Sequence, residues 1–119
     1  MLARLSPHAN LWLERDEQVV LSRWRVRLLE AIEETGSISG AAKRVGVQYR
    51  LAWDRLEEME NGLGVALVTR QVGGSGGGGA RLTEAGRGYV ARFNRFAAAV
   101  DAIVSAQFEQ AFGAGQHSP

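Results

Sequence analysis

The sequence predicts a mainly α-helical domain that carries one small β-hairpin and ends in a long helix. Three observations lead to this fold class. Apolar residues recur at helical spacing in separate stretches of the first half of the chain. A β-branched stretch then precedes a run of glycines, and an apolar stripe at helical spacing continues almost to the C-terminus.

Length and composition fit one domain. The chain has 119 residues, of which 45% are hydrophobic and 23% charged. We expect a single domain over residues 1–112, followed by a disordered tail at 113–119. There is no cysteine, which excludes disulfides, thiolate metal sites and a cysteine nucleophile. Without a signal-peptide pattern or an apolar run of membrane-spanning length, the sequence predicts a cytoplasmic protein that does not contact membranes.

The N-terminal third predicts a short β element followed by a helix. Two apolar runs, at 11–13 and 19–21, fit either a weak hairpin or a strand that leads into the helix. Ser22 can cap a helix over 23–35 by accepting from a free amide, and Gly36 can end it in the left-handed conformation. The apolar side of this helix consists of Trp24, Leu28, Ala31 and Ile32.

The next segment predicts a helix-turn-helix. Ser39, or alternatively Ser37, caps a helix of about six residues that ends at Gly46. A helix this short is unstable alone, so its neighbours must pack against it. The second helix covers about residues 48–60. Its inward face is formed by Leu51, Ala52, Leu56 and Met59, which leaves the outer face free to enter a major groove.

A β-hairpin of the kind called a wing follows. Residues 63–72 predict one strand and residues 80–82 a second. The connection holds six glycines in seven residues, so it cannot form regular structure. Its free amides suit a phosphate strand or a minor groove, but a plain hairpin tip or an interdomain linker has the same composition. These wing residues are Gly73, Gly74, Ser75, Gly76, Gly77, Gly78 and Gly79.

The last helix predicts a homodimer. Thr83 can cap it, and we expect it over 84–112. Its length of roughly 40 Å exceeds the width of a domain of about 80 residues. The surplus apolar surface therefore predicts a second copy as its partner. That stripe consists of Tyr89, Phe93, Phe96, Val100 and Ile103.

Double-stranded DNA is the ligand that the charge pattern favours. Residues 37–55 carry four basic side chains and one acidic side chain, a net charge of +3, between acidic flanks. We expect Gln48, Tyr49 and Arg50 to contact base edges or phosphates. Trp53 either packs at the core edge or stacks against the nucleic acid, and the same two alternatives apply to Tyr49. The other predicted DNA contacts are Ser37, Ser39, Lys43, Arg44, Arg70 and Arg81.

Two other classes of protein compete with this prediction. A winged-helix protein-interaction module that has lost DNA binding would fit the total net charge of +1 and the acids after the second helix. An enzyme has little support, because the two histidines, His8 and His117, lie near the chain ends. No nucleophile motif, metal-ligand set or phosphate loop accompanies them. We therefore expect no catalysis and no cofactor.

These residues resemble the LysR-type DNA-binding domain. The resemblance is carried by Gly-Ser-Ile-Ser-Gly-Ala-Ala at 36–42, by Val47, by Leu-Gly-Val-Ala-Leu at 63–67 and by Leu-Thr-Glu-Ala-Gly at 82–86. The chain is more similar still to the N-terminal DNA-binding domain of the ModE family of molybdate-responsive regulators. That similarity rests on Tyr-Arg-Leu-Ala-Trp-Asp at 49–54 and on the glycine wing, and it covers about residues 11–110.

The resemblance implies a winged helix-turn-helix, an antiparallel dimer through the long helix, and transcriptional control of molybdenum-related genes. In the ModE family, molybdate-binding domains follow the DNA-binding domain, and this sequence stops before them. We therefore expect a stand-alone regulator. Either a separate oxyanion-sensing protein supplies the signal, or this member does not respond to molybdate.

Overall fold

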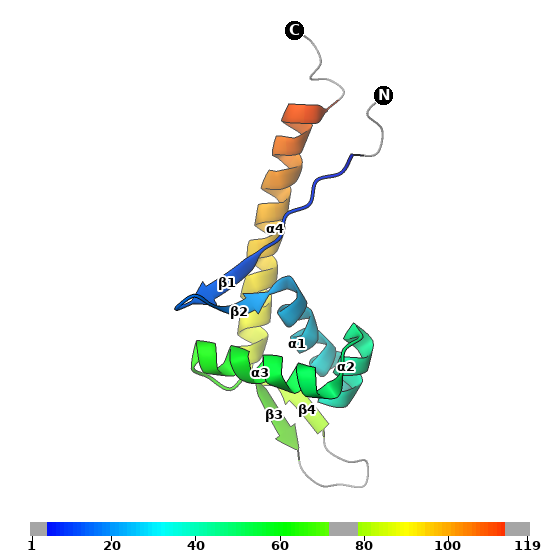
Figure 1. The fold of residues 1–119 in the computed structure, drawn as a ribbon, viewed down its shortest axis with the longest axis vertical. Helices are drawn as coiled ribbons and strands as arrows, with labels where there is room; N and C mark the ends of the chain where they lie inside the picture. Colours follow the sequence, from blue (N-terminus) through cyan, green and yellow to red (C-terminus); the bar gives the residue numbers. More distant parts are fainter. Residues whose placement is uncertain (1–4, 72–78, 114–119) are drawn as a thin grey trace.

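The computed structural model describes residues 5–71 and 79–113. Within them the helices α1–α3 form a small body, a wing extends from one end, and α4 projects from the other (Figure 1). This arrangement confirms the predicted mainly α-helical winged helix-turn-helix with a long C-terminal helix. The elements are β1 (Trp12–Arg15), β2 (Gln18–Ser22), α1 (Arg23–Thr35), α2 (Ile38–Val45), α3 (Tyr49–Leu63), β3 (Val68–Gln71), β4 (Gly79–Leu82) and α4 (Glu84–Phe112).

The two N-terminal apolar runs form a hairpin. β1 and β2 are antiparallel and are joined by Asp16 and Glu17, both with positive φ (52° and 67°). Two such residues make the turn whose twist suits adjacent antiparallel strands. The hairpin lies against the end of α3, because Arg15 Nη1 donates to the Gly62 carbonyl at 2.7 Å. A Cβ on Gly62 would lie only 2.7 Å from a methyl carbon of Val20, so glycine permits this close packing.

The core lies between α1, α2, α3 and the base of the wing. α1 occupies its centre and has the predicted ends. Ser22 Oγ accepts from the Arg25 amide at 3.1 Å, and Gly36 has a φ of 79°. Each large core side chain contributes about 1.5–3 kcal/mol by leaving water. The largest fully buried ones are Val26, Leu28, Leu29, Ile32, Leu56, Met59 and Leu67.

The boundaries of the helix-turn-helix differ from the prediction. Ser37, and not Ser39, caps α2, since its hydroxyl accepts from the Gly40 amide at 2.8 Å. α2 therefore has eight residues instead of six. α3 continues to Leu63 before Gly64 ends it, because contacts with the N-terminal hairpin and the core support its last turn. The strand expected from residue 63 consequently begins only at Val68.

Hydrogen bonds fix the base of the wing to the body. Glu60 Oε2 accepts from the amides of Leu67 and Val68 at 2.8 and 3.2 Å. On the other strand, the Ala80 amide donates to the Gly36 carbonyl at 2.8 Å. Gly79, which was expected in the loop, is the first residue of β4. The other predicted wing residues, 73–78, lie outside the described residues, as does the predicted tail beyond Gly113.

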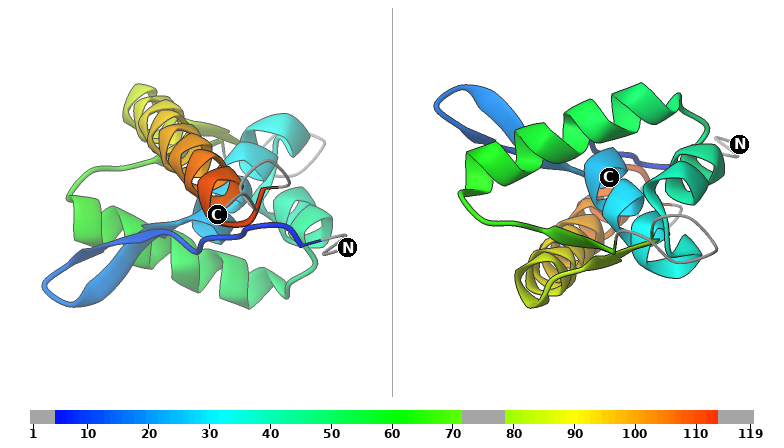
Figure 2. Two further views of the ribbon diagram at one scale, coloured as in Figure 1. Left: turned by 90° about the horizontal axis from the view of Figure 1, so that it is seen from above. Right: turned by 90° about the horizontal axis from the view of Figure 1, so that it is seen from below.

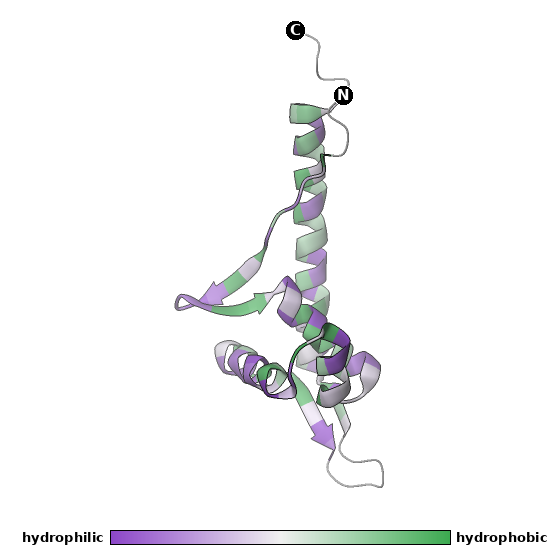
Figure 3. Ribbon diagram, turned by 45° about the vertical axis from the view of Figure 1, so that its right-hand side comes forward, coloured by the Kyte–Doolittle hydropathy of each residue, from purple (hydrophilic) through white to green (hydrophobic). Residues whose placement is uncertain are grey.

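α4 begins at the predicted cap and leaves the body. Thr83 Oγ1 accepts from the Gly86 amide at 2.9 Å. The 29 residues of α4 span about 43 Å. The radius of gyration is 18.4 Å, whereas a compact chain of this length would have about 13.5 Å. Figure 3 shows apolar residues continuing along the projecting half of α4. None of the helices in the described ranges is long and apolar enough to cross a membrane.

Candidate nucleic-acid interface

α3 buries one side and exposes the other. Ala52, Leu56 and Met59 lie in the core, whereas Arg50, Asp54 and Glu57 on the opposite side are exposed. Seen from below, α3 passes on one side of α1 and the wing strands pass on the other (Figure 2, right). Both lie toward the end of the molecule opposite the projecting end of α4 (Figure 1). The dimensions of a major groove admit a helix that is exposed in this way.

The predicted contacts on α2 and α3 meet at one corner. The Val47 amide donates to the Ala42 carbonyl at 2.9 Å, which brings the last turn of α2 beside the first turn of α3. Lys43 and Arg44 are therefore placed close to Gln48, Tyr49 and Arg50. All five of these side chains are exposed, and 52% of Tyr49 is accessible.

Arg44 and Ser37 have partners within the protein. Arg44 Nη1 lies 2.8 Å from Glu34 Oε1, and both side chains are more than half exposed. An exposed pair of this kind contributes about 0–1 kcal/mol, so a phosphate can displace the carboxylate at little cost. Ser37 is half-buried and serves as the cap of α2, while Ser39 is exposed in its first turn. Ser39 is therefore the more accessible of the two predicted serines.

Trp53 packs at the edge of the core, the first of its two predicted alternatives. The guanidinium carbon of Arg70 lies over the indole, 4.4 Å from its centroid. The ring of Tyr49 meets the indole edge-on, with the centroids 6.3 Å apart. The wing thus contacts α3 through Arg70 on the ring of Trp53, and Tyr49 packs against the same ring from within α3. Sequence reasoning missed this contact, because Arg70 and Trp53 belong to different elements. Arg81 is exposed on β4.

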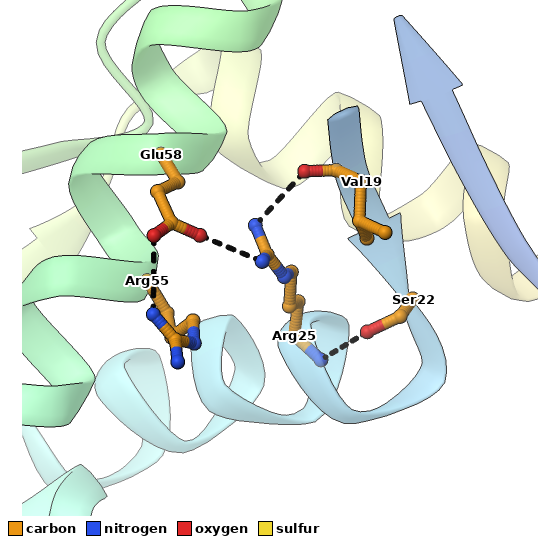
Figure 4. A network of polar contacts seen from close by, with 5 residues as sticks. All are labelled: Val19, Ser22, Arg25, Arg55 and Glu58. Carbon is orange, nitrogen blue, oxygen red and sulfur yellow. Dashed lines mark hydrogen bonds and ion pairs between the residues drawn. The ribbon is translucent and has the colours of Figure 1, made fainter. Parts of the chain in front are cut away.

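Glu58 is the centre of an ion network that sequence reasoning also missed (Figure 4). Its two carboxylate oxygens accept from Arg25 Nη2 at 2.7 Å and from Arg55 Nη1 at 3.1 Å. Arg25 is only 9% exposed, and it also donates to the Val19 carbonyl at 3.2 Å. The network ties α1, α3 and β2 together behind the exposed face of α3.

Most other acids that flank the basic stretch have internal partners as well. Glu60 accepts the wing amides described above, and Glu33 Oε1 accepts from the Leu82 amide at 2.8 Å. Glu30 Oε2 accepts from Asn94 Nδ2 at 2.8 Å. These carboxylates hold the body, the wing and α4 together. Because these carboxylates are engaged within the protein, they oppose phosphate binding less than the charge pattern along the sequence suggested.

Comparison with known protein families shows which family this helix-turn-helix and wing resemble. Residues 24–87, which run from α1 through the wing into the first turn of α4, match the model of the bacterial regulatory helix-turn-helix proteins of the lysR family. This match covers more than half of the chain and includes α2, α3 and both wing strands.

Curated relatives bear names connected with molybdenum. The chain is 47% identical over 85 residues to the molybdenum transport protein ModE of Azotobacter vinelandii, covering 71% of this chain and 32% of that protein. It is 47% identical over 81 residues to the molybdenum-pterin-binding protein MopB of Rhodobacter capsulatus, covering 68% and 30%. The DNA-binding transcriptional dual regulator ModE of Escherichia coli K12 is 42% identical over 77 residues, covering 65% and 29%. The chain thus spans about a third of the length of these relatives.

Solved structures agree with the fold. ArgP from Mycobacterium tuberculosis superposes with a TM-score of 0.52 at 26% identity, covering 72% of this chain and 30% of that one. A LysR family transcriptional regulator superposes with a TM-score of 0.57 at 24% identity, covering 76% and 29%. With its helix-turn-helix and wing matched from α1 to the first turn of α4, the chain belongs to the lysR family of bacterial regulatory helix-turn-helix proteins.

Proposed function

We propose that this chain acts as a homodimeric, sequence-specific DNA-binding regulator of transcription of the ModE type. The observation that carries the proposal is that α3, the corner between α2 and α3, and the wing lie near one end of the molecule (Figures 1 and 2), with Arg50 on α3 and Arg70 and Arg81 on the wing strands exposed. The free end of α4 lies at the other end, where a second copy can bind without covering this surface. The curated relatives include proteins named as DNA-binding or transcriptional regulators, which favours regulation over catalysis.

Phosphate contacts and base contacts would have different roles in DNA binding. Lys43, Arg44, Arg70 and Arg81 would bind phosphates and fix the position of the protein on the duplex, since phosphate contacts carry no sequence information. Gln48, Tyr49 and Arg50 would read base edges from the start of α3, where Gln48 is the N-cap. Two copies would then occupy half-sites about 34 Å apart, or a multiple of that distance.

The exposed part of α4 supports a dimer, although two members of the predicted stripe pack on the protomer's own core. Tyr89 is half-buried against that core. Phe93 is only 3% exposed and belongs to the core of the protomer, so it is not available to a second copy. Phe96 and Ile103 are 44% and 62% exposed, and half-buried Val100 lies between them. Burying such a line of apolar side chains favours association.

The charges of α4 favour an antiparallel pair. Its N-terminal half carries Arg87, Arg92 and Arg95 against Glu84, a net charge of +2, whereas its C-terminal half carries Asp101, which is paired with Arg23 of the same chain, and Glu109. Antiparallel pairing would bring the basic half of one helix beside the acidic half of the other. Parallel pairing would place like charges together, which is destabilising.

The names of the relatives suggest which genes are controlled. Proteins called molybdenum transport protein and molybdenum-pterin-binding protein match most of this chain. We therefore assign the regulator to genes that handle molybdenum. Because it must reach the chromosome, it would act in the cytoplasm. Because the match covers only about a third of these relatives, we assign no oxyanion site to this chain.

Selection of binding sites from random-sequence duplex DNA tests the proposal. We expect enrichment of a two-fold symmetric motif whose half-sites lie one helical turn, or a multiple of it, apart. A variant with Arg50 and Lys43 both changed to alanine serves as the control and should enrich little. If the wild-type protein enriches no motif and shifts no duplex at low salt, DNA binding is wrong, and the protein-interaction module takes its place.

The molybdenum assignment has its own test. The selected motif is searched for in the genome that encodes this chain, and a reporter gene is placed under the promoters that contain it. We expect the motif upstream of genes for molybdate uptake or molybdenum-cofactor synthesis, and reporter expression that changes when this protein is deleted. A motif found only upstream of unrelated genes would refute the molybdenum role and leave DNA binding intact.

A further inference from the structure

The contact between Arg70 and Trp53 joins the wing to α3 at the proposed DNA surface. The guanidinium carbon of Arg70 lies 4.4 Å from the indole centroid, within the range of a cation–π interaction. Trp53 is held in turn, because one part of it packs against the core and its ring meets Tyr49 edge-on. The indole is therefore a fixed surface, while the arginine that covers it is exposed to solvent.

The backbone of Arg70 is fixed from two sides. Two residues before it, the Val68 amide donates to Glu60 Oε2 at 3.2 Å. Across the hairpin, Arg70 is paired with Ala80. Ala80 is 7% exposed, and its amide donates to the Gly36 carbonyl at 2.8 Å. The strand that carries Arg70 thus has a defined position relative to α3.

Stacking leaves the hydrogen-bonding edge of the arginine available. A guanidinium is planar, and its five N–H groups lie in that plane. When one face covers an indole, these donors remain at the rim, where they match the two oxygens of a phosphate. Holding the plane in place before DNA arrives also reduces the rotamer freedom that Arg70 must lose on binding.

We infer that Trp53 is a positioning residue, which holds the guanidinium of Arg70 ready to bind a phosphate of the DNA backbone beside the groove that α3 enters. This inference rests on the proposed DNA-binding function and adds a role for an aromatic residue that does not itself read a base. It also makes the two residues interdependent. Removing the indole should cost most of what Arg70 contributes to DNA affinity.

A double-mutant cycle measures this interdependence. The variants are Arg70→Ala, Trp53→Leu and the two combined, each titrated with the selected duplex and with a random-sequence duplex. Leucine keeps an apolar side chain at the core edge but has no π face. We expect Arg70→Ala to weaken binding about tenfold and Trp53→Leu about fivefold on both duplexes. The double variant should lose about tenfold, well short of the roughly fiftyfold product that independent residues would give.

Two controls separate positioning from folding. Trp53→Phe restores an aromatic face and should bind within about twofold of the wild type. Arg81→Ala removes the wing arginine of the neighbouring strand. The factor by which it weakens DNA binding should multiply with the factor for Trp53→Leu, because the two residues act independently. Melting curves followed by circular dichroism establish that each variant is folded at the temperature of the titration.

The free protein provides a readout that does not depend on DNA. An aromatic ring shifts the NMR signals of groups above its face, so the side-chain signals of Arg70 should lie upfield in the wild type and in Trp53→Phe, and return in Trp53→Leu. Binding by Trp53→Leu at the wild-type level, or losses that multiply fully, would overturn this inference alone. Failure of the wild-type protein to bind any duplex would overturn the proposed function, and this inference with it.

Discussion

At the residue scale, carboxylates decide how the basic charge of the molecule is presented. Glu58, Glu60 and Glu33 accept hydrogen bonds from other parts of the chain, and such charge-assisted bonds are about twice as strong as neutral ones. These three carboxylates therefore stabilise the fold. Asp54 and Glu57 remain exposed on the outer side of α3, where acidic groups repel phosphates and accept hydrogen bonds from bases such as cytosine.

Replacing Glu58 with alanine should destabilise the protein by about 1–3 kcal/mol. The change removes a partner of nearly buried Arg25, and a buried cation that loses its carboxylate is costly. The exposure of Glu58 itself, 48%, places the expected value in the lower half of this range. Arg55→Ala is the matched control and should cost at most about 1 kcal/mol, because an i,i+3 ion pair on a helix contributes little and its loss leaves Glu58 paired with Arg25. Urea unfolding measures both, and equal losses would contradict the distinction.

Arg50→Ala should weaken binding to the selected DNA motif by about 1–3 kcal/mol and relax the preference at one base pair. The physical reason is the loss of a pair of hydrogen bonds to a base edge from the exposed first turn of α3. Affinity measured on the motif and on its single-base variants checks the prediction. If the affinity falls by the same factor on every sequence, Arg50 binds phosphate instead of reading a base.

Lys43→Ala should weaken binding to all sequences alike. A phosphate contact releases about one condensed counterion, so the slope of log affinity against log salt should become shallower by about one unit. Titrations between low and moderate salt measure this slope for Lys43→Ala and for Arg50→Ala side by side. A change of base preference in the lysine variant would contradict its assigned role.

At the scale of the elements, the first turn of α4 packs closely against the backbone just before β3. A Cβ on Gly86 would lie 2.3 Å from the carbonyl oxygen of Leu67, which is backbone and cannot turn aside. Thr83 reinforces the junction, because its amide donates to the same carbonyl at 2.9 Å and its hydroxyl donates to the Ala66 carbonyl at 2.8 Å. The direction in which α4 leaves the body thus depends on a glycine in its first turn.

Gly86→Ala should destabilise the protein by about 1–3 kcal/mol through this overlap. Gly88→Ala is the matched control two residues later in the same helix. There a Cβ would meet only the flexible end of Arg92, at 3.3 Å, and alanine should stabilise the helix by about 0.5–1 kcal/mol. Thermal unfolding of both variants shows whether each substitution raises or lowers the stability. A stabilising Gly86→Ala would refute the close approach.

At the scale of the whole molecule, α4 gives the protein its elongated shape. Principal extents of 68, 30 and 22 Å describe a body with one projecting helix. Near its middle, α4 is tied to α1 by Arg23, whose two Nη atoms lie 2.8 and 3.2 Å from the Asp101 carboxylate. Beyond this tie, Ile103 and Phe112 are exposed. An apolar surface held away from its own core is suited to a partner.

Phe96→Glu combined with Ile103→Glu should convert the proposed dimer into a monomer, because two charges would be buried in an apolar interface. Light scattering after size-exclusion chromatography measures the mass, and affinity for the two-fold motif should fall by about a hundredfold as the second half-site contact becomes independent. Ala102 is also exposed but lies on another side of α4, so Ala102→Glu should leave the mass and the DNA affinity unchanged. A double variant that remains dimeric would contradict the proposed interface.

The linear sequence determined the features that depend on neighbouring residues. Ser22, Gly36, Gly46 and Thr83 end or begin helices as predicted, because capping involves atoms only a few positions apart. The spacing of apolar residues also predicted the long terminal helix and the side of α3 that faces outward. These local signals were sufficient to predict a winged helix-turn-helix and the residues that we propose contact DNA.

Tertiary structure alone decided the features that need residues distant in sequence. α3 reaches Leu63 because the N-terminal hairpin packs on its last turn. Phe93 is buried because the protomer's own core covers it, although its helical position also fits the dimer stripe. The positions of Arg70 over Trp53 and of Glu58 beside Arg25 follow from the packing of separate elements. Spacing along the chain specifies which side of an element a residue occupies, but only packing specifies what that side contacts.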